Sequence, residues 1–201
     1  MSDSSLIINS SYDPPNRHHL YNRELRKFEI NNGRRKSGYV IPSNNSNTFD
    51  DPGVFIEIPI VNKVRERVDI WRQNEYPGVT TTTKKLLRHW RDQDQRNFPF
   101  FFCQLEAIET LIWFIETGDN EKIGIQIEQQ NISFERLCCK MATGSGKTVV
   151  MSMLIAWQAL NKIENPRDTR FSKVFLIVTP GHTVRRRLSV LNHSDKNNYY
   201  D

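Results

Sequence analysis

Residues 141–148 read Met-Ala-Thr-Gly-Ser-Gly-Lys-Thr and carry the groups with which a short loop can bind a triphosphate. Such a loop turns its backbone N–H groups toward the anion, which Gly144 and Gly146 permit because they have no Cβ. Lys147 supplies a cation for the β- and γ-phosphates, and the Thr148 hydroxyl suits Mg²⁺. The residues predicted to bind the phosphates of ATP are Thr143, Gly144, Ser145, Gly146, Lys147 and Thr148.

The segments on both sides of this loop match the setting in which phosphate loops occur. A short apolar run over 134–141 predicts a strand, and the apolar stretch 148–163 predicts a long helix whose dipole would face the phosphates. The Walker A pattern, Gly-x4-Gly-Lys-[Ser/Thr], matches at its last three positions, whereas Met141 replaces the first glycine. A glycine-rich turn without a ligand is the alternative, and the flanking elements argue against it.

A second apolar run follows that helix and points to the fold class. Residues 173–179 read Lys-Val-Phe-Leu-Ile-Val-Thr and end at Pro180-Gly181. A continuous apolar run predicts a strand buried on both faces of a parallel sheet. Strand, loop, helix and strand together form one βαβ unit. The fold is therefore predicted to be α/β, with an incomplete parallel sheet and flanking helices.

The part of the chain before the loop has a polar start and then becomes helical. Residues 1–50 are predicted to be largely irregular, with one short hairpin over 28–40 that turns at Asn32-Gly33. An edge strand is expected over 54–60, and a weak strand over 122–128. Amphipathic helices are predicted near 61–71, 82–90 and 103–116. Core packing is predicted for Trp71, Trp90, Trp113 and Trp157.

Composition sets broad limits on function. The net charge of +5 permits nucleic-acid binding without demonstrating it. Cys103, Cys138 and Cys139 form neither an even disulfide framework nor a zinc set, so buried reduced thiols are expected. No apolar run approaches the roughly 18 residues of a membrane helix. The first residues show no secretory signal, and the predicted location is the cytoplasm.

Several motifs in chain order resemble the front part of superfamily 2 (DEAD/DEAH-type) helicases. The loop at 141–148 resembles their motif I, in which the first position is relaxed. The closest similarity is to the Res subunits of type III restriction enzymes, and it covers about residues 51–195. Besides the loop, the similar segments are 54–90, 100–113 (Phe-Phe-Phe-Cys-Gln-Leu-Glu-Ala-Ile-Glu-Thr-Leu-Ile-Trp), and Val178-Thr-Pro-Gly181 with 183–191, which resembles motif Ia.

The resemblance implies that ATP and Mg²⁺ are the ligands, and that the intact enzyme couples ATP hydrolysis to translocation on DNA. Gln104 stands where the family has a glutamine that reads adenine. A carboxamide suits this role, because it can pair with both a hydrogen-bond donor and an acceptor on the base. An ordinary polar residue in a first helical turn is the alternative. Contacts to the backbone of double-stranded DNA would come from Thr179, His182, Arg185 and Arg186. A merely solvated face explains the arginines equally well.

The resemblance also implies an organisation and protein partners. A polar N-terminal segment (1–50) would precede a helical region with the adenine-reading segment (51–130). An incomplete RecA-like P-loop NTPase lobe would then occupy 131–201. The implied partners are a modification (methyltransferase) subunit or a chain that completes the helicase. No membrane partner is expected.

The sequence departs from the family in ways that leave two functions open. No motif II carboxylate pair follows Thr148, and a second helicase lobe with its arginine finger is missing. The first hypothesis is the ATP-binding portion of a restriction-type DNA translocase. The second is a truncated, non-catalytic remnant that binds nucleotide or a partner without turnover. A P-loop kinase is a distant third, because it would need neither the Gln104 segment nor the Thr-Pro-Gly element.

Overall fold

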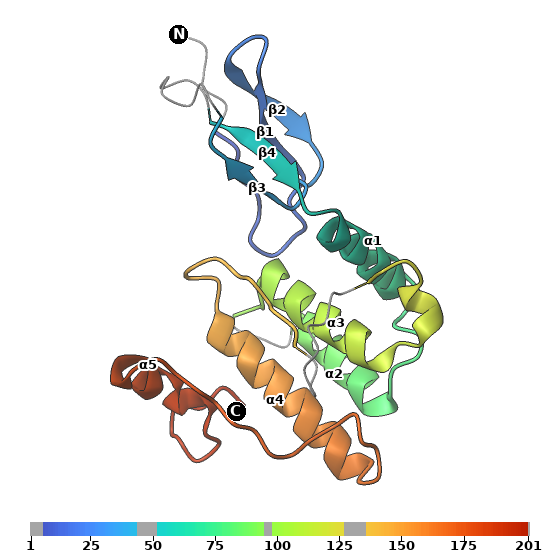
Figure 1. The fold of residues 1–201 in the computed structure, drawn as a ribbon. Coiled ribbons are helices and arrows are strands. Elements are labelled where there is room, and N and C mark those ends of the chain that lie inside the picture. The colour runs from blue at the N-terminus through green and yellow to red at the C-terminus, as the bar shows by residue number, and fades with distance from the viewer. Residues whose placement is uncertain (1–5, 44–51, 95–97, 127–135, 201) are drawn as a thin grey trace. The chain divides into compact units, whose positions relative to one another are not determined.

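The chain divides into two compact units, Met1–Arg67 and Val68–Asp201. A computed structural model describes residues 6–43, 52–94, 98–126 and 136–200, and Figure 1 traces their path. The first unit contains four strands and the beginning of helix α1. The second unit contains the rest of α1, the other helices and the loop 141–148. The division of the chain into the segments 1–50, 51–130 and 131–201 stays a prediction.

Two antiparallel hairpins form the first unit, and neither is the predicted one. Strand β1 pairs with β2 so that Arg17 lies opposite Asn32, and β3 pairs with β4 so that Gly38 lies opposite Glu57. The predicted turn at Asn32-Gly33 was wrong, since it marks the end of β2. The strand bounds are β1 (Arg17–Asn22), β2 (Lys27–Asn32), β3 (Gly38–Ile41) and β4 (Val54–Glu57).

A local hydrogen-bond pattern explains the position of the first turn. The Asn22 side-chain oxygen accepts from the backbone N–H groups of Glu24 at 3.0 Å and Leu25 at 3.1 Å. This Asx-type turn begins at Asn22 and reverses the chain before it reaches Asn32-Gly33. Arg26, the last residue before β2, takes the left-handed conformation. A side-chain preference of one asparagine therefore overrode the stronger dipeptide signal.

The predicted helices are confirmed, and each begins at a recognisable signal. Helix α1 starts with a proline, which fits the first helical position. The Thr80 side chain caps α2 by accepting from Thr83 N at 3.0 Å. Gly146 precedes α4 in a left-handed conformation. The bounds are α1 (Pro59–Gln73), α2 (Thr81–Arg91), α3 (Phe102–Glu116) and α4 (Lys147–Glu164).

Shorter elements complete the second unit. They are the 3₁₀ helices η1 (Asp119–Lys122) and η2 (Leu188–Leu191) and the helix α5 (His182–Arg187). Residues 123–126 form no strand, and the rest of the weak strand predicted over 122–128 lies outside the described residues. No helix among the described residues is long and apolar enough to cross a membrane.

The predicted parallel sheet is not present in the described residues. The sheets there are the two antiparallel hairpins, and residues 136–142 and 173–178 have no strand assignment. The prediction that 173–179 is buried on both faces was wrong. Exposure alternates along this run, and the highly exposed side chains are those of Val174 (79%), Leu176 (89%) and Val178 (83%). The apolar composition was recognised, but a buried strand needs neighbours that the described residues do not provide.

The cysteines share this exposure. Cys103, Cys138 and Cys139 are free thiols, as expected, but all three are exposed, so the predicted burial was wrong. For Cys138 and Cys139 the reason is the missing sheet, because residues 136–140 lie on the surface.

The four tryptophans lie in the core, as predicted, but two of them differ in polar contacts. Trp71, Trp90, Trp113 and Trp157 are all buried. Trp157 Nε1 donates to Glu116 Oε1 at 2.7 Å and to Thr83 Oγ1 at 3.0 Å. Trp113 Nε1 is buried without a hydrogen-bond partner among the described residues.

This difference predicts unequal effects of the same substitution. Trp157→Phe loses hydrogen bonds to a buried carboxylate, whereas Trp113→Phe removes an unsatisfied donor, and the change in volume is identical. We expect Trp157→Phe to lower the free energy of unfolding by about 2 kcal/mol more than Trp113→Phe. Urea unfolding of both variants measures this difference. Equal losses would contradict the assigned hydrogen bonds.

Candidate phosphate-binding site

The loop before α4 has the backbone geometry that a phosphate-binding loop requires. Gly144 and Gly146 lie at φ +79° and +78°, in the left-handed region that favours glycine. Residues 143–145 form a turn, and the Ser145 hydroxyl donates to Ala142 O at 2.7 Å. The N–H groups of Lys147 and Thr148 lie in the first turn of α4, where no intrahelical acceptor is available. A helix start of this kind attracts an anion.

Lys147 folds back over the loop instead of extending away from it. Its Nζ donates to Met141 O at 3.1 Å and to Ala142 O at 2.7 Å. The ammonium group therefore lies beside the loop backbone, close to where a bound phosphate would be held. To contact a phosphate it must exchange these two neutral carbonyls for phosphate oxygens, which are stronger acceptors.

Gln104, which is 42 residues before Gly146 in the chain, lies directly on this loop. Its Nε2 donates to Ser145 O at 3.1 Å, and its Oε1 accepts from Phe101 N at 2.9 Å. The side chain is buried. Nε2 has two hydrogens and Oε1 has two lone pairs, and each atom uses one of its two in these hydrogen bonds. One hydrogen and one lone pair of the carboxamide are therefore left over among the described contacts. Gln104 thus contacts the loop, which the sequence did not predict, while adenine reading stays a prediction.

Helices α3 and α4 hold these two parts together because they lie side by side and run in the same direction (Figure 1). Gln104, in the first turn of α3, contacts Ser145 just before α4. Glu116, at the end of α3, contacts Trp157 in the second half of α4. Both helix N-termini are therefore at the same end of the pair. Cys103 lies there too, and partial desolvation by its neighbours raises the pKa of its thiol although the residue is exposed.

The loop residues fit a magnesium triphosphate by their chemistry. The glycine conformations, the first-turn N–H groups that have no intrahelical acceptor and the nearby ammonium group all suit phosphate oxygens. Mg²⁺ is usually held by one or two protein oxygens together with substrate phosphates. The half-buried Thr148 is placed in the first turn of α4 for such a contact.

The residues predicted to contact DNA follow the loop in the chain, and in the part that the structure describes they make no side-chain hydrogen bond or ion pair with it. Thr179 is half-exposed, and His182 begins α5. Arg185 and Arg186 are exposed in the last turn of this six-residue helix. Basic side chains at a helix C-terminus are also favoured by the helix dipole, so their position fits either interpretation.

Comparison with known proteins gives one family. Residues 97–194 match the family model described as type III restriction enzyme, res subunit. We call residues 97–194 the Res segment, after this match. This Res segment contains Gln104, the phosphate loop and the motif Ia-like element. The match indicates a helicase-like, ATP-binding region of restriction-enzyme type. No curated protein and no solved structure matches the chain.

The sequence did not reveal the polar residues that join the helices of the Res segment to α2. Glu116 and Asn161 are buried although both are polar, and each contacts Thr83 on α2. A signal was available, because both residues occupy positions that continue an apolar helical stripe. Asn161 follows Val150 and Trp157 on one face of α4. A polar residue in such a stripe indicates a buried hydrogen-bond network.

Proposed function

We propose that this chain binds ATP with Mg²⁺ through the loop 143–148, as the nucleotide-binding part of a restriction-type DNA translocase in the cytoplasm. The observation that carries the proposal is the contact between Gln104 and Ser145. It joins an adenine-reading candidate to a loop with two left-handed glycines, inside a Res segment. A chance glycine-rich turn would not need such a partner.

Each residue has a defined role in the proposed binding. The backbone N–H groups of residues 143–148 and the α4 N-terminus surround the phosphates. Lys147 moves from the carbonyls of Met141 and Ala142 to the β- and γ-phosphates. The Thr148 hydroxyl holds Mg²⁺, which offsets phosphate charge. Gln104 uses its remaining hydrogen and lone pair for the adenine edge, which would make ATP preferred over GTP.

Calorimetric titration of the chain with ATP and Mg²⁺ tests this proposal, with Lys147→Ala as the decisive variant. Losing the ammonium group removes a charge-assisted contact to phosphate, and we expect affinity to fall by about 30-fold or more. Lys140→Ala is the matched control, since Lys140 is an exposed lysine just before the loop. If Lys147→Ala and Lys140→Ala bind ATP as the unchanged chain does, phosphate binding by this loop is excluded.

The alternative is a chain that binds nucleotide, or a partner, without turnover. Release of inorganic phosphate in the presence of DNA separates the two functions. Phosphate release that Lys147→Ala abolishes would support the translocase. ATP binding without phosphate release would support the non-catalytic alternative.

DNA contact by Thr179, His182, Arg185 and Arg186 belongs to the same proposal. Contacts to phosphates carry no sequence information and weaken steeply with salt. Binding to a duplex should therefore depend on salt and not on sequence. The family generally works with a DNA-modification subunit, and that subunit is the protein partner we propose.

A further inference from the structure

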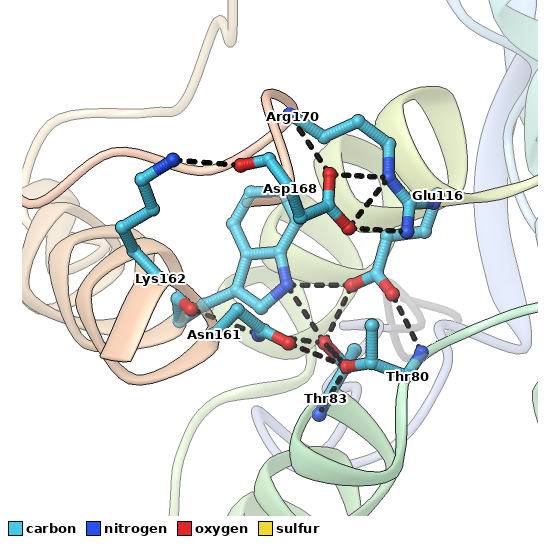
Figure 2. Close-up of polar contacts among 8 residues, drawn as sticks. Thr80, Thr83, Glu116, Asn161, Lys162, Asp168 and Arg170 are labelled. Carbon is cyan, nitrogen blue, oxygen red and sulfur yellow. Dashed lines mark hydrogen bonds and ion pairs between the residues drawn. The ribbon is translucent and has the colours of Figure 1, made fainter. Parts of the chain in front are cut away.

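A cluster of buried polar side chains joins α2, α3 and α4 at the end of the helix pair away from the phosphate loop (Figure 2). The Glu116 carboxylate accepts from Thr80 N at 2.7 Å, from Thr83 Oγ1 at 2.5 Å and from Trp157 Nε1 at 2.7 Å. Asn161 Nδ2 donates to Thr83 Oγ1 at 2.9 Å. We call Thr83, Glu116, Trp157 and Asn161 the Glu116 cluster.

The Glu116 cluster is more specific than an apolar contact would be. A hydrogen bond fixes distance and direction, whereas apolar side chains can slide against each other at small cost. The Glu116 carboxylate receives three donors from two elements, α4 and the start of α2. Moving α4 along α3 by even one residue would leave this buried carboxylate without its indole donor, which is costly.

The segment after α4 strengthens the same end of the pair. Arg170 pairs with Asp168 at 2.8 Å, and Lys162 Nζ donates to Asp168 O at 2.8 Å. The Arg170 hydrogen bond lowers the pKa of Asp168 to about 2, so this pair persists at neutral pH. Phe171 is buried and packs edge-on against Trp157, with 5.6 Å between ring centroids. Trp157 is thereby held from two sides.

At the other end of the pair, the contact between α3 and the loop is slight. Gln104 Nε2 makes one hydrogen bond to Ser145 O, and the Cys103 sulfur lies 4.0 Å from the same oxygen. One hydrogen bond of a neutral amide cannot by itself fix the register of two helices. The register is therefore set elsewhere, and the Glu116 cluster is the strongest polar link between them.

We propose that the Glu116 cluster is a positioning device for the nucleotide site: it fixes α4 against α3 and so keeps Gln104 seated on the phosphate loop. None of its residues would touch the nucleotide. The proposal rests on the proposed function for its second consequence, adenine preference. Its first consequence, order in the loop, does not need a nucleotide.

Backbone hydrogen exchange, measured without nucleotide, tests the first consequence. Val149 N and Val150 N donate to Gly146 O and report on the start of α4. In Trp157→Phe we expect their exchange to accelerate about fivefold relative to the amides of Met153 and Leu154 in the middle of the same helix. Comparing amides within α4 removes the effect of global unfolding. Trp113→Phe is the matched control and should leave this ratio unchanged.

The ratio of ATP to GTP affinity tests the second consequence. A loss of folded protein lowers both apparent affinities by the same factor, so the ratio is insensitive to stability. We expect the ratio to fall by about fivefold in Trp157→Phe, as Gln104 loses its position, and to stay unchanged in Trp113→Phe. Should Trp157→Phe fail to fold, Glu116→Gln keeps the shape and removes the charge that strengthens these hydrogen bonds.

The outcomes separate the two proposals. Faster exchange at Val149 and Val150 in the cluster variants supports positioning, whether or not nucleotide binds. Unchanged exchange in a folded cluster variant overturns it. If the unchanged chain protects the Val149 and Val150 amides from exchange but binds neither ATP nor GTP, the proposed function is overturned. The exchange result on positioning would remain valid. An unchanged ATP to GTP ratio would overturn the link from the cluster to Gln104.

Discussion

Gly146→Ala is expected to lower ATP affinity by about 100-fold, for two reasons that add. A residue with a Cβ at φ +78° costs about 1–2 kcal/mol. A Cβ at this position would also lie 2.1 Å from Gln104 Nε2. Gln104 can move only by breaking its hydrogen bonds to Ser145 O and Phe101 N, each of which contributes about 1 kcal/mol.

Gly144→Ala is the matched control for this experiment. Gly144 has nearly the same φ, +79°, but nothing lies within 4 Å of its ideal Cβ. It should therefore lose only about tenfold in affinity, from backbone strain alone. Adding Gln104→Ala to Gly146→Ala should recover part of the loss. Equal effects at Gly144 and Gly146 in calorimetric titrations would show that Gln104 does not press on the loop.

Glu109→Ala is expected to cost the chain about 3 kcal/mol of unfolding free energy, because it leaves the partly buried Arg91 without its anion and Arg72 with Asp69 alone. Glu109 lies in the middle of α3 with a side-chain exposure of 1%. It accepts from Arg72 Nε at 2.8 Å, from Arg91 Nε at 2.5 Å and from Tyr76 Oη at 2.9 Å. Burial, together with the charge of Glu109, raises the pKa of Tyr76, so its hydroxyl stays a donor.

A surface ion pair provides the contrast. Glu75 and Arg88 lie 3.3 Å apart with exposed side chains, and pairs of this kind contribute less than about 1 kcal/mol. Urea unfolding of Glu109→Ala, Glu109→Gln and Glu75→Ala should rank their losses in that order. A loss for Glu109→Ala no larger than that for Glu75→Ala would show that Arg72 and Arg91 find water instead. These two arginines keep 17% and 31% of their side-chain surface exposed.

Helix positions in this chain could be predicted from the sequence because apolar spacing and helix-start signals agree. The stripe through Leu105, Ile108 and Ile112 fixed α3, and the glycine before Lys147 fixed the start of α4. The turn at 143–145 lies just before α4, as predicted, while phosphate binding by this loop stays a prediction with a chemical basis. Few residue combinations can bind phosphate, and their spacing is set by the ligand.

The remaining features depend on contacts between distant segments. Glu109 and Glu116 lie seven residues apart in α3, and although Glu116 continues an apolar stripe, the sequence does not show which donors from other helices surround the two carboxylates. The parallel sheet was predicted from the composition of 173–179. Apolar composition shows that a segment would be stable as a buried strand, but it does not show whether neighbouring strands are present to pair with it. The observed hairpin differs from the predicted one because the Asn22 side chain forms a turn with the backbone of Glu24 and Leu25.

The run 174–178 also has a consequence for the life of the chain in a cell. The run forms no strand pair within the described residues, and its alternate side chains Val174, Leu176 and Val178 are highly exposed. Chaperones and proteases identify misfolded proteins by short, extended apolar segments of this kind. Quality-control machinery should therefore bind this chain while the run is uncovered. Its cellular half-life would then report how often the segment is shielded.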